Sequence, residues 1–88
     1  MARWLWDRGV AAVATDNPAV EVAPGDPAVG SLHRRLIPLL GFALGELFDF
    51  GRLALDSAAD GKYTSLFMAA PLNLPGGVGS PGNAVAVK

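Results

Sequence analysis

Two stretches rich in turn-forming residues, 16–30 and 71–82, divide this chain into short apolar segments. Eleven glycines and seven prolines among 88 residues leave material for at most one small domain. A domain of this size buries only about 60% of the surface that its unfolded chain exposes. Because 51% of the residues are apolar, we expect much of that apolar surface to need a partner.

Charge and composition exclude several classes of function. Seven Lys and Arg against eight Asp and Glu give a net charge of -1, which disfavours a nucleic-acid-binding role. The absence of cysteine excludes a disulfide framework and a thiolate metal site. The longest apolar run, residues 36–45, contains a proline and is far shorter than the about 20 residues of a membrane span. We therefore expect a cytoplasmic protein that contacts neither nucleic acid nor a membrane.

The N-terminal residues predict a helix followed by a strand. Residues 1–8 indicate the last two turns of a helix, which ends at Gly9. Residues 10–15 are apolar throughout, which is typical of a short strand covered on both faces. A parallel crossover of this kind needs an earlier strand, so we expect the sequence to begin inside a larger fold. The loop 16–30 then leaves the C-terminal end of the strand, where α/β proteins bind ligands.

Two further helices are predicted. Ser31 can cap a helix over residues 32–37. Pro38 either kinks the continuation of this helix to Leu40 or leaves that continuation undecided. Asp49 is predicted to cap a helix over residues 50–59.

Three segments are predicted to be extended. Residues 63–70 are rich in strand-forming types, and residues 84–87 form a last strand. Residues 42–48 also indicate a strand, and its alternation gives one face made of Phe42, Leu44, Glu46 and Phe48. The chain as a whole therefore belongs to the α/β class.

Two residues are candidates for chemistry. His33 is the only histidine and follows the turn-rich loop, although most histidines in such positions are ordinary polar residues. Glu46 places a carboxylate in an apolar stripe, where it must be paired, hydrogen-bonded or metal-bound to offset its desolvation. If the segment is helical instead, Glu46 faces water.

Several stretches occur in a specific order along the whole chain: residues 4–10, 32–36, 46–49, 69–72 and 76–83. Together they resemble the C-terminal part of the cyclase family, which includes the bacterial kynurenine formamidases and isatin hydrolase. The resemblance implies that residues 1–88 are an incomplete, C-terminal part of a single domain with a swivelling β/β/α fold. Each stretch alone is weakly specific, and their joint order carries the similarity.

The resemblance also implies a function. Members of this family are metal-dependent hydrolases that cleave an amide such as N-formylkynurenine, in tryptophan catabolism, or a related cyclic amide. His33 and Glu46 match the family's C-terminal metal-ligand positions, and a nitrogen with a carboxylate oxygen suits zinc or manganese. The metal would polarise the carbonyl group and activate a water molecule. By the same resemblance we expect a homo-oligomer.

One departure from the family pattern limits this expectation. The family's defining motif, His-x-Gly-Thr-His-x-Asp-x-Pro-x-His, supplies the remaining metal ligands and the general acid or base, and this sequence does not contain it. Since a catalytic zinc takes three protein ligands, we expect no catalytic residue here and little or no activity from these residues alone. A missing N-terminal half, supplied separately, would complete the enzyme. The alternative is a small non-catalytic interaction or oligomerisation module in which His33 and Glu46 are incidental.

Overall fold

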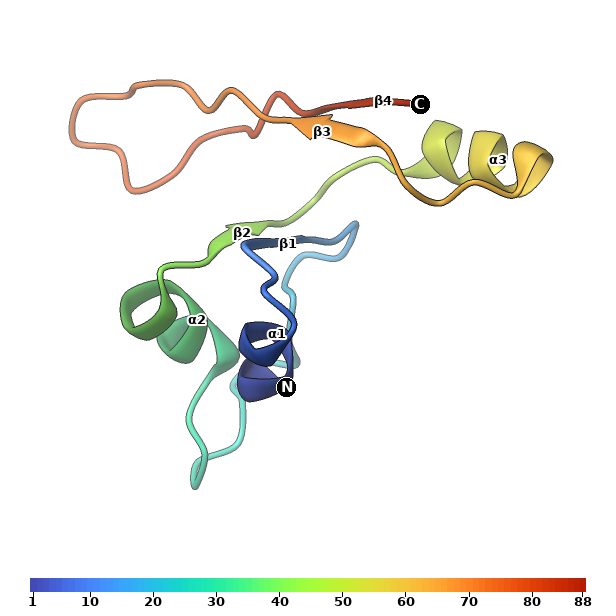
Figure 1. Ribbon diagram of the computed structural model, residues 1–88. Coiled ribbons are helices and arrows are strands. Elements are labelled where there is room, and N and C mark those ends of the chain that lie inside the picture. Colours follow the sequence, from blue (N-terminus) through green and yellow to red (C-terminus); the bar gives the residue numbers. More distant parts are fainter. The chain divides into compact units, whose positions relative to one another are not determined.

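The computed structural model describes residues 1–88 and contains seven short elements (Figure 1). In chain order these are α1 (Ala2–Asp7), β1 (Ala12–Ala14), α2 (Leu32–Leu40), β2 (Ala43–Gly45), α3 (Gly51–Asp60), β3 (Leu66–Met68) and β4 (Val85–Val87). The chain divides into two compact units, Met1–Asp49 and Phe50–Lys88. Each unit is described by itself below.

A parallel strand pair forms the centre of the first unit. Strands β1 and β2 lie side by side, with Val13 opposite Leu44 (Figure 1). Helix α2 lies in the connection between them, so β1, α2 and β2 form a β-α-β unit. The prediction that residues 10–15 are covered on both faces is wrong, because Ala12 is exposed and Val13 is only half-buried. A two-stranded sheet has one face against the helices and leaves the other uncovered.

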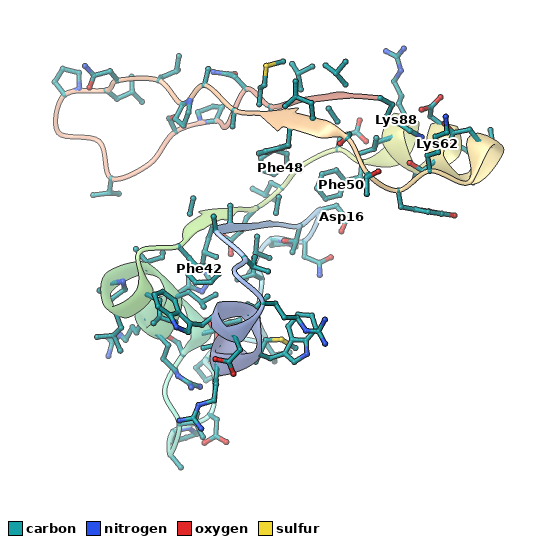
Figure 2. All side chains as sticks on the ribbon, in the orientation of Figure 1. Asp16, Phe42, Phe48, Phe50, Lys62 and Lys88 are labelled. Carbon is teal, nitrogen blue, oxygen red and sulfur yellow. The ribbon has the colours of Figure 1, made fainter.

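The core of this unit lies where the two helices meet the sheet. Phe42, which directly precedes β2, lies between this strand and the helices (Figure 2). Leu36 of α2 is wholly buried. The buried apolar residues are Ala2, Leu5, Leu36 and Phe42, and partly buried Val10, Val13, Leu32, Leu40 and Leu44 pack against them.

Helix α2 begins and ends at residues whose chemistry explains its bounds. The Ser31 hydroxyl accepts a hydrogen bond from the Arg34 N–H at 3.3 Å, which confirms the predicted cap. The helix continues through Pro38 to Leu40, further than residues 32–37. Pro38 has no N–H to donate to the carbonyl four residues before it, so the helix continues past this position with one hydrogen bond fewer. Gly41 then adopts a left-handed conformation with φ of 71°, which a residue without Cβ does freely.

Strand β2 is shorter than predicted. It ends at Gly45, and Leu47 has a positive φ of 58°, so the alternation expected over residues 42–48 stops after Leu44. Glu46 and Phe48 therefore do not belong to a strand face. The Leu47 N–H donates to the Asn17 carbonyl at 3.0 Å and the Phe48 N–H donates to the Thr15 carbonyl at 3.1 Å. These bonds hold the start of the loop 16–30 beside Glu46.

The second unit contains a helix and an antiparallel strand pair. Helix α3 has Phe50 in the N-cap position, so the prediction that Asp49 caps it is wrong by one residue. Strands β3 and β4 pair around the predicted loop 71–82, with Phe67 opposite Ala86. Lys88 forms ion pairs from its Nζ to Asp60 Oδ1 at 2.8 Å and to Asp56 Oδ2 at 3.1 Å. These ion pairs connect the end of the chain to α3.

No helix in the structure combines the length and apolar character needed to cross a lipid bilayer.

Candidate functional site

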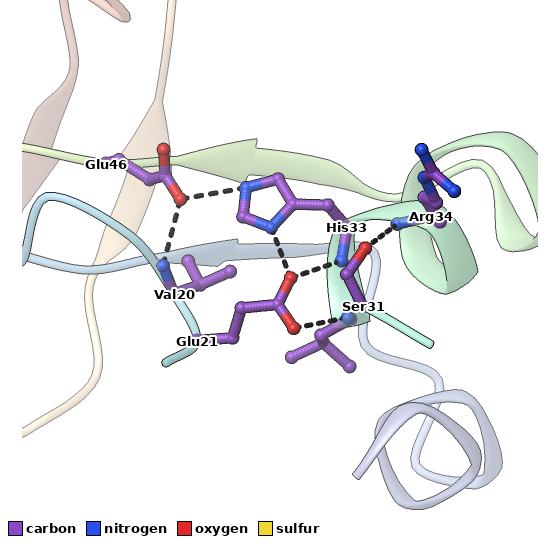
Figure 3. Close-up of polar contacts among 7 residues, drawn as sticks. Val20, Glu21, Ser31, His33, Arg34 and Glu46 are labelled. Carbon is purple, nitrogen blue, oxygen red and sulfur yellow. Dashed lines mark hydrogen bonds and ion pairs between the residues drawn. The ribbon is translucent and has the colours of Figure 1, made fainter. Parts of the chain in front are cut away.

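Glu21 binds the first turn of helix α2. Its carboxylate accepts hydrogen bonds from the Leu32 N–H and, at 2.9 Å, from the His33 N–H (Figure 3). The first N–H groups of a helix have no partner within the helix, and the helix dipole favours a negative charge beside them. The loop 16–30 therefore supplies an anionic cap in addition to Ser31.

The His33 ring lies between two carboxylates. His33 Nδ1 is 2.7 Å from Glu21 Oε1, and His33 Nε2 is 3.0 Å from Glu46 Oε1 (Figure 3). Glu46 Oε1 also accepts a hydrogen bond from the Val20 N–H at 2.9 Å. We call Glu21, His33 and Glu46 the carboxylate–histidine cluster. Its three side chains come from the loop, the first turn of α2 and the segment after β2, and all remain partly accessible to solvent.

Contacts within the cluster shift the pKa values of Glu21 and His33 in opposite directions. Hydrogen bonds from the His33 and Leu32 N–H groups, together with the His33 ring, lower the pKa of Glu21 from 4.5 to about 2. The hydrogen bond to Glu21 raises the pKa of His33 above 6.5, and the Glu46 charge adds to this effect while burial opposes it. Glu21 is consequently ionised throughout the physiological range, and His33 holds its proton more strongly than a free histidine.

The stability of the unit Met1–Asp49 is expected to depend on pH through this cluster. The contribution of Glu21 is complete above about pH 4.5 and is lost as the pH falls towards about 2, because its folded pKa is depressed. The contribution of His33 is complete below pH 6.5 and is lost as the pH rises through its raised pKa. Urea unfolding at a series of pH values, followed by the fluorescence of Trp4 and Trp6, measures the free energy of unfolding on both the acid limb, where Glu21 is protonated, and the alkaline limb, where His33 loses its proton.

Two variants control this measurement. Glu21→Ala should flatten the acid limb, whereas Asp7→Asn, a change to an exposed carboxylate on α1, should leave it unchanged. Equal acid limbs in the wild type and in Glu21→Ala would contradict the assignment of this limb to Glu21.

The structure brings together the two residues that the sequence singled out. His33 and Glu46 lie in contact, while their role as metal ligands stays a prediction. Glu46 has the polar partners predicted for a partly buried carboxylate, the Val20 N–H and the His33 ring. The prediction that Glu46 lies on the face of a strand is wrong, because β2 ends at Gly45.

Glu21 was not predicted. It lies within the otherwise apolar stretch 19–23, so the desolvation argument used for Glu46 applies to it equally and could have identified it.

The donor atoms of the cluster fit part of a metal site. His33 Nε2 and Glu46 Oε1 supply the nitrogen and oxygen ligands that zinc and manganese accept. Their separation of 3.0 Å is that of an ion pair, and it is somewhat shorter than the about 3.4 Å between two ligands of a tetrahedral zinc ion bound at about 2.1 Å. Glu21 faces Nδ1 and the backbone instead, and no group of three or more His, Cys, Asp or Glu side chains is arranged to hold a metal ion. This chain therefore offers two ligands, and a closed site needs others.

A separate shallow cavity of about 270 Å³ lies between α1 and α2. Arg3, Asp7 and Arg35 are among its lining residues, and no member of the carboxylate–histidine cluster is.

The chain is similar to a solved protein over nearly its whole length. A crystal structure described as that of a novel cyclase matches 99% of this chain, with 41% sequence identity and a TM-score of 0.84. The chain spans only 28% of the length of that protein. No family model and no curated protein matches the sequence. The chain is thus similar to part of the solved protein, both in sequence and in its mixed arrangement of helices and strands.

Proposed function

We propose, from the relationship of this chain to the cyclase family, that its residues form the C-terminal part of a metal-dependent hydrolase with a swivelling β/β/α fold. One observation supports the metal role above all others: His33 Nε2 and Glu46 Oε1 converge to 3.0 Å although they come from different segments of the chain. A histidine with two carboxylates in contact with its ring is also a typical surrounding of a metal-ligating imidazole.

In this proposal His33 and Glu46 are two of the ligands of a zinc or manganese ion. Such an ion supplies Lewis-acid chemistry, because it polarises a bound carbonyl group and lowers the pKa of a water molecule. The Val20 N–H holds the Glu46 carboxylate in place, and the fold of the loop 16–30 keeps His33 beside it. The remaining ligands and the general acid or base come from residues outside these 88.

The proposed substrate is a small amide, N-formylkynurenine or a related cyclic amide. The family resemblance supports this choice, and the open position of the cluster is compatible with it, since 34% of the His33 side chain and 28% of the Glu46 side chain are exposed. The further surface needed to enclose a substrate belongs to the rest of the enzyme, which we propose to be a cytoplasmic homo-oligomer.

A hybrid protein tests this proposal. The segment of the solved cyclase that matches this chain is replaced by residues 1–88, which the 41% identity makes feasible. We expect the hybrid to bind zinc or manganese to the same content as the parent cyclase, measured by elemental analysis after dialysis. The Glu46→Gln change keeps the acceptor for the Val20 N–H and removes the charge, so it should lower the metal content strongly.

Asp7→Asn is the matched control for this charge change, and it should leave the metal content at the level of the unmodified hybrid. A parent or hybrid that contains no metal, or a Glu46→Gln hybrid with unchanged metal content, would contradict the proposed role of Glu46.

A further inference from the structure

Glu21 contacts His33 in two ways at once. Its Oε1 atom accepts the backbone N–H of His33 at 2.9 Å and faces the ring Nδ1 of the same residue at 2.7 Å. Its other oxygen accepts the Leu32 N–H. The carboxylate is thus attached to the same helical turn that carries the ring, and the position of one determines the position of the other.

We infer that Glu21 is a positioning residue, which keeps the ring proton of His33 on Nδ1 and thereby presents the Nε2 lone pair beside Glu46. This inference rests on the proposed function in one respect, that Nε2 is the atom that faces the metal. Glu21 itself touches neither metal nor substrate in this arrangement and acts only through His33.

The two carboxylates differ in how strongly they bind the ring. Glu21 is held by two backbone N–H groups, is 16% exposed and is 2.7 Å from Nδ1. Glu46 is held by one backbone N–H group, is 28% exposed and is 3.0 Å from Nε2. A shorter bond to a better-anchored and less solvated carboxylate holds a proton more firmly. When the ring is neutral, its single proton therefore resides on Nδ1.

This arrangement has a direct chemical consequence. A histidine binds a metal through a nitrogen that carries no proton, and its other ring N–H usually donates to a carboxylate or a carbonyl group. Glu21 supplies that carboxylate from within the chain. Loss of such a partner typically weakens metal binding by about 10-fold to 100-fold.

The tautomer can be measured without any metal. His33 is the only histidine, so the ring nitrogens of the full ¹⁵N-labelled chain give a single pair of signals in a long-range ¹H–¹⁵N NMR correlation spectrum. At a pH at which the ring is neutral, we expect a protonated Nδ1 and an unprotonated Nε2. A proton on Nε2 in the wild-type chain overturns the inference, whatever happens to the variants.

Two variants separate the roles of the carboxylates. Glu21→Ala should move the proton to Nε2, because Glu46 is then the only carboxylate in contact with the ring. Glu46→Gln should leave the proton on Nδ1. A folded Glu21→Ala chain that keeps its proton on Nδ1 overturns the inference. A purely structural role for Glu21 would change stability and leave the tautomer unchanged.

Titration with Zn²⁺ distinguishes failure of this inference from failure of the proposed function. We expect Zn²⁺ to shift the Nε2 signal of the wild-type chain, to leave Nδ1 protonated, and to bind Glu21→Ala about 10-fold to 100-fold more weakly. If Zn²⁺ shifts neither nitrogen signal while Glu21→Ala still moves the proton, His33 and Glu46 do not bind the ion without ligands from outside these 88 residues, and the positioning role of Glu21 stands. The metal content of the hybrid cyclase then decides the metal role. If Zn²⁺ binds Glu21→Ala and the wild type equally well at Nε2, the metal role stands and the inference is overturned.

Discussion

Replacing Leu36 with alanine is expected to destabilise the unit Met1–Asp49 by about 2–5 kcal/mol, the usual cost of deleting a large buried side chain. Leu36 is wholly buried in a core of only four residues, so few neighbours can move into the space that it leaves. A unit of this size has a total stability of only a few kcal/mol, on the order of 0.1 kcal/mol per residue. We therefore expect most Leu36→Ala molecules to be unfolded at room temperature.

Urea unfolding followed by tryptophan fluorescence measures this effect, since both tryptophans lie on α1 in the same unit. Leu39→Ala is the matched control, because Leu39 belongs to the same helix and is 74% exposed, and it should change stability by less than about 0.5 kcal/mol. Leu36→Met conserves volume and should cost less than about 1.5 kcal/mol, which keeps the comparison quantitative if Leu36→Ala does not fold. Equal effects of Leu36→Ala and Leu39→Ala would show that Leu36 is not a core residue in solution.

Replacing His33 with alanine in the hybrid cyclase is expected to lower kcat/KM for the hydrolysis of N-formylkynurenine by more than about 100-fold. This exceeds the 10-fold to 100-fold loss typical of removing a residue that only supports a ligand, because His33 is proposed to be a ligand itself. The same change leaves both carboxylates without the ring that lies between them. The rate and the metal content should therefore fall together.

Arg34→Ala is the matched control, because Arg34 is exposed on the same helical turn and its side chain forms no ion pair with the cluster. It should leave the rate within a few-fold of the unmodified hybrid. Full metal content with a reduced rate in His33→Ala would indicate a role for His33 other than metal binding. An unchanged rate would contradict the proposed function.

The order of the elements followed from local features of the sequence. Ser31 begins α2, as predicted, because a hydroxyl can accept a bond from the first turn. The end of α2 at Gly41 was not predicted, since Pro38 left the continuation of the helix undecided. The loops 16–30 and 71–82 contain the turn-forming residues that exclude regular structure. These properties depend on a few neighbouring residues, which is why they are visible without tertiary information.

The lengths of the strands could not be predicted in the same way. Residues 42–48 alternate as a strand would, but β2 ends at Gly45, and β1 covers only half of the apolar segment 10–15. Strand length depends on how far a partner strand runs alongside, and only three residue pairs are matched between β1 and β2. The backbone N–H groups beyond Gly45 bond instead to the loop after β1.

The sequence by itself determined the order of the helices and turns, and it identified His33 and Glu46 as the residues to examine, because these properties depend on residue type and near neighbours. Only the tertiary structure decided that Glu21 and Glu46, which lie 12 and 13 positions from His33 in opposite directions, meet on one imidazole ring. The physical reason is that loop conformation is set by long-range hydrogen bonds, such as the one from the Val20 N–H to Glu46, and no periodic pattern in the sequence encodes such bonds.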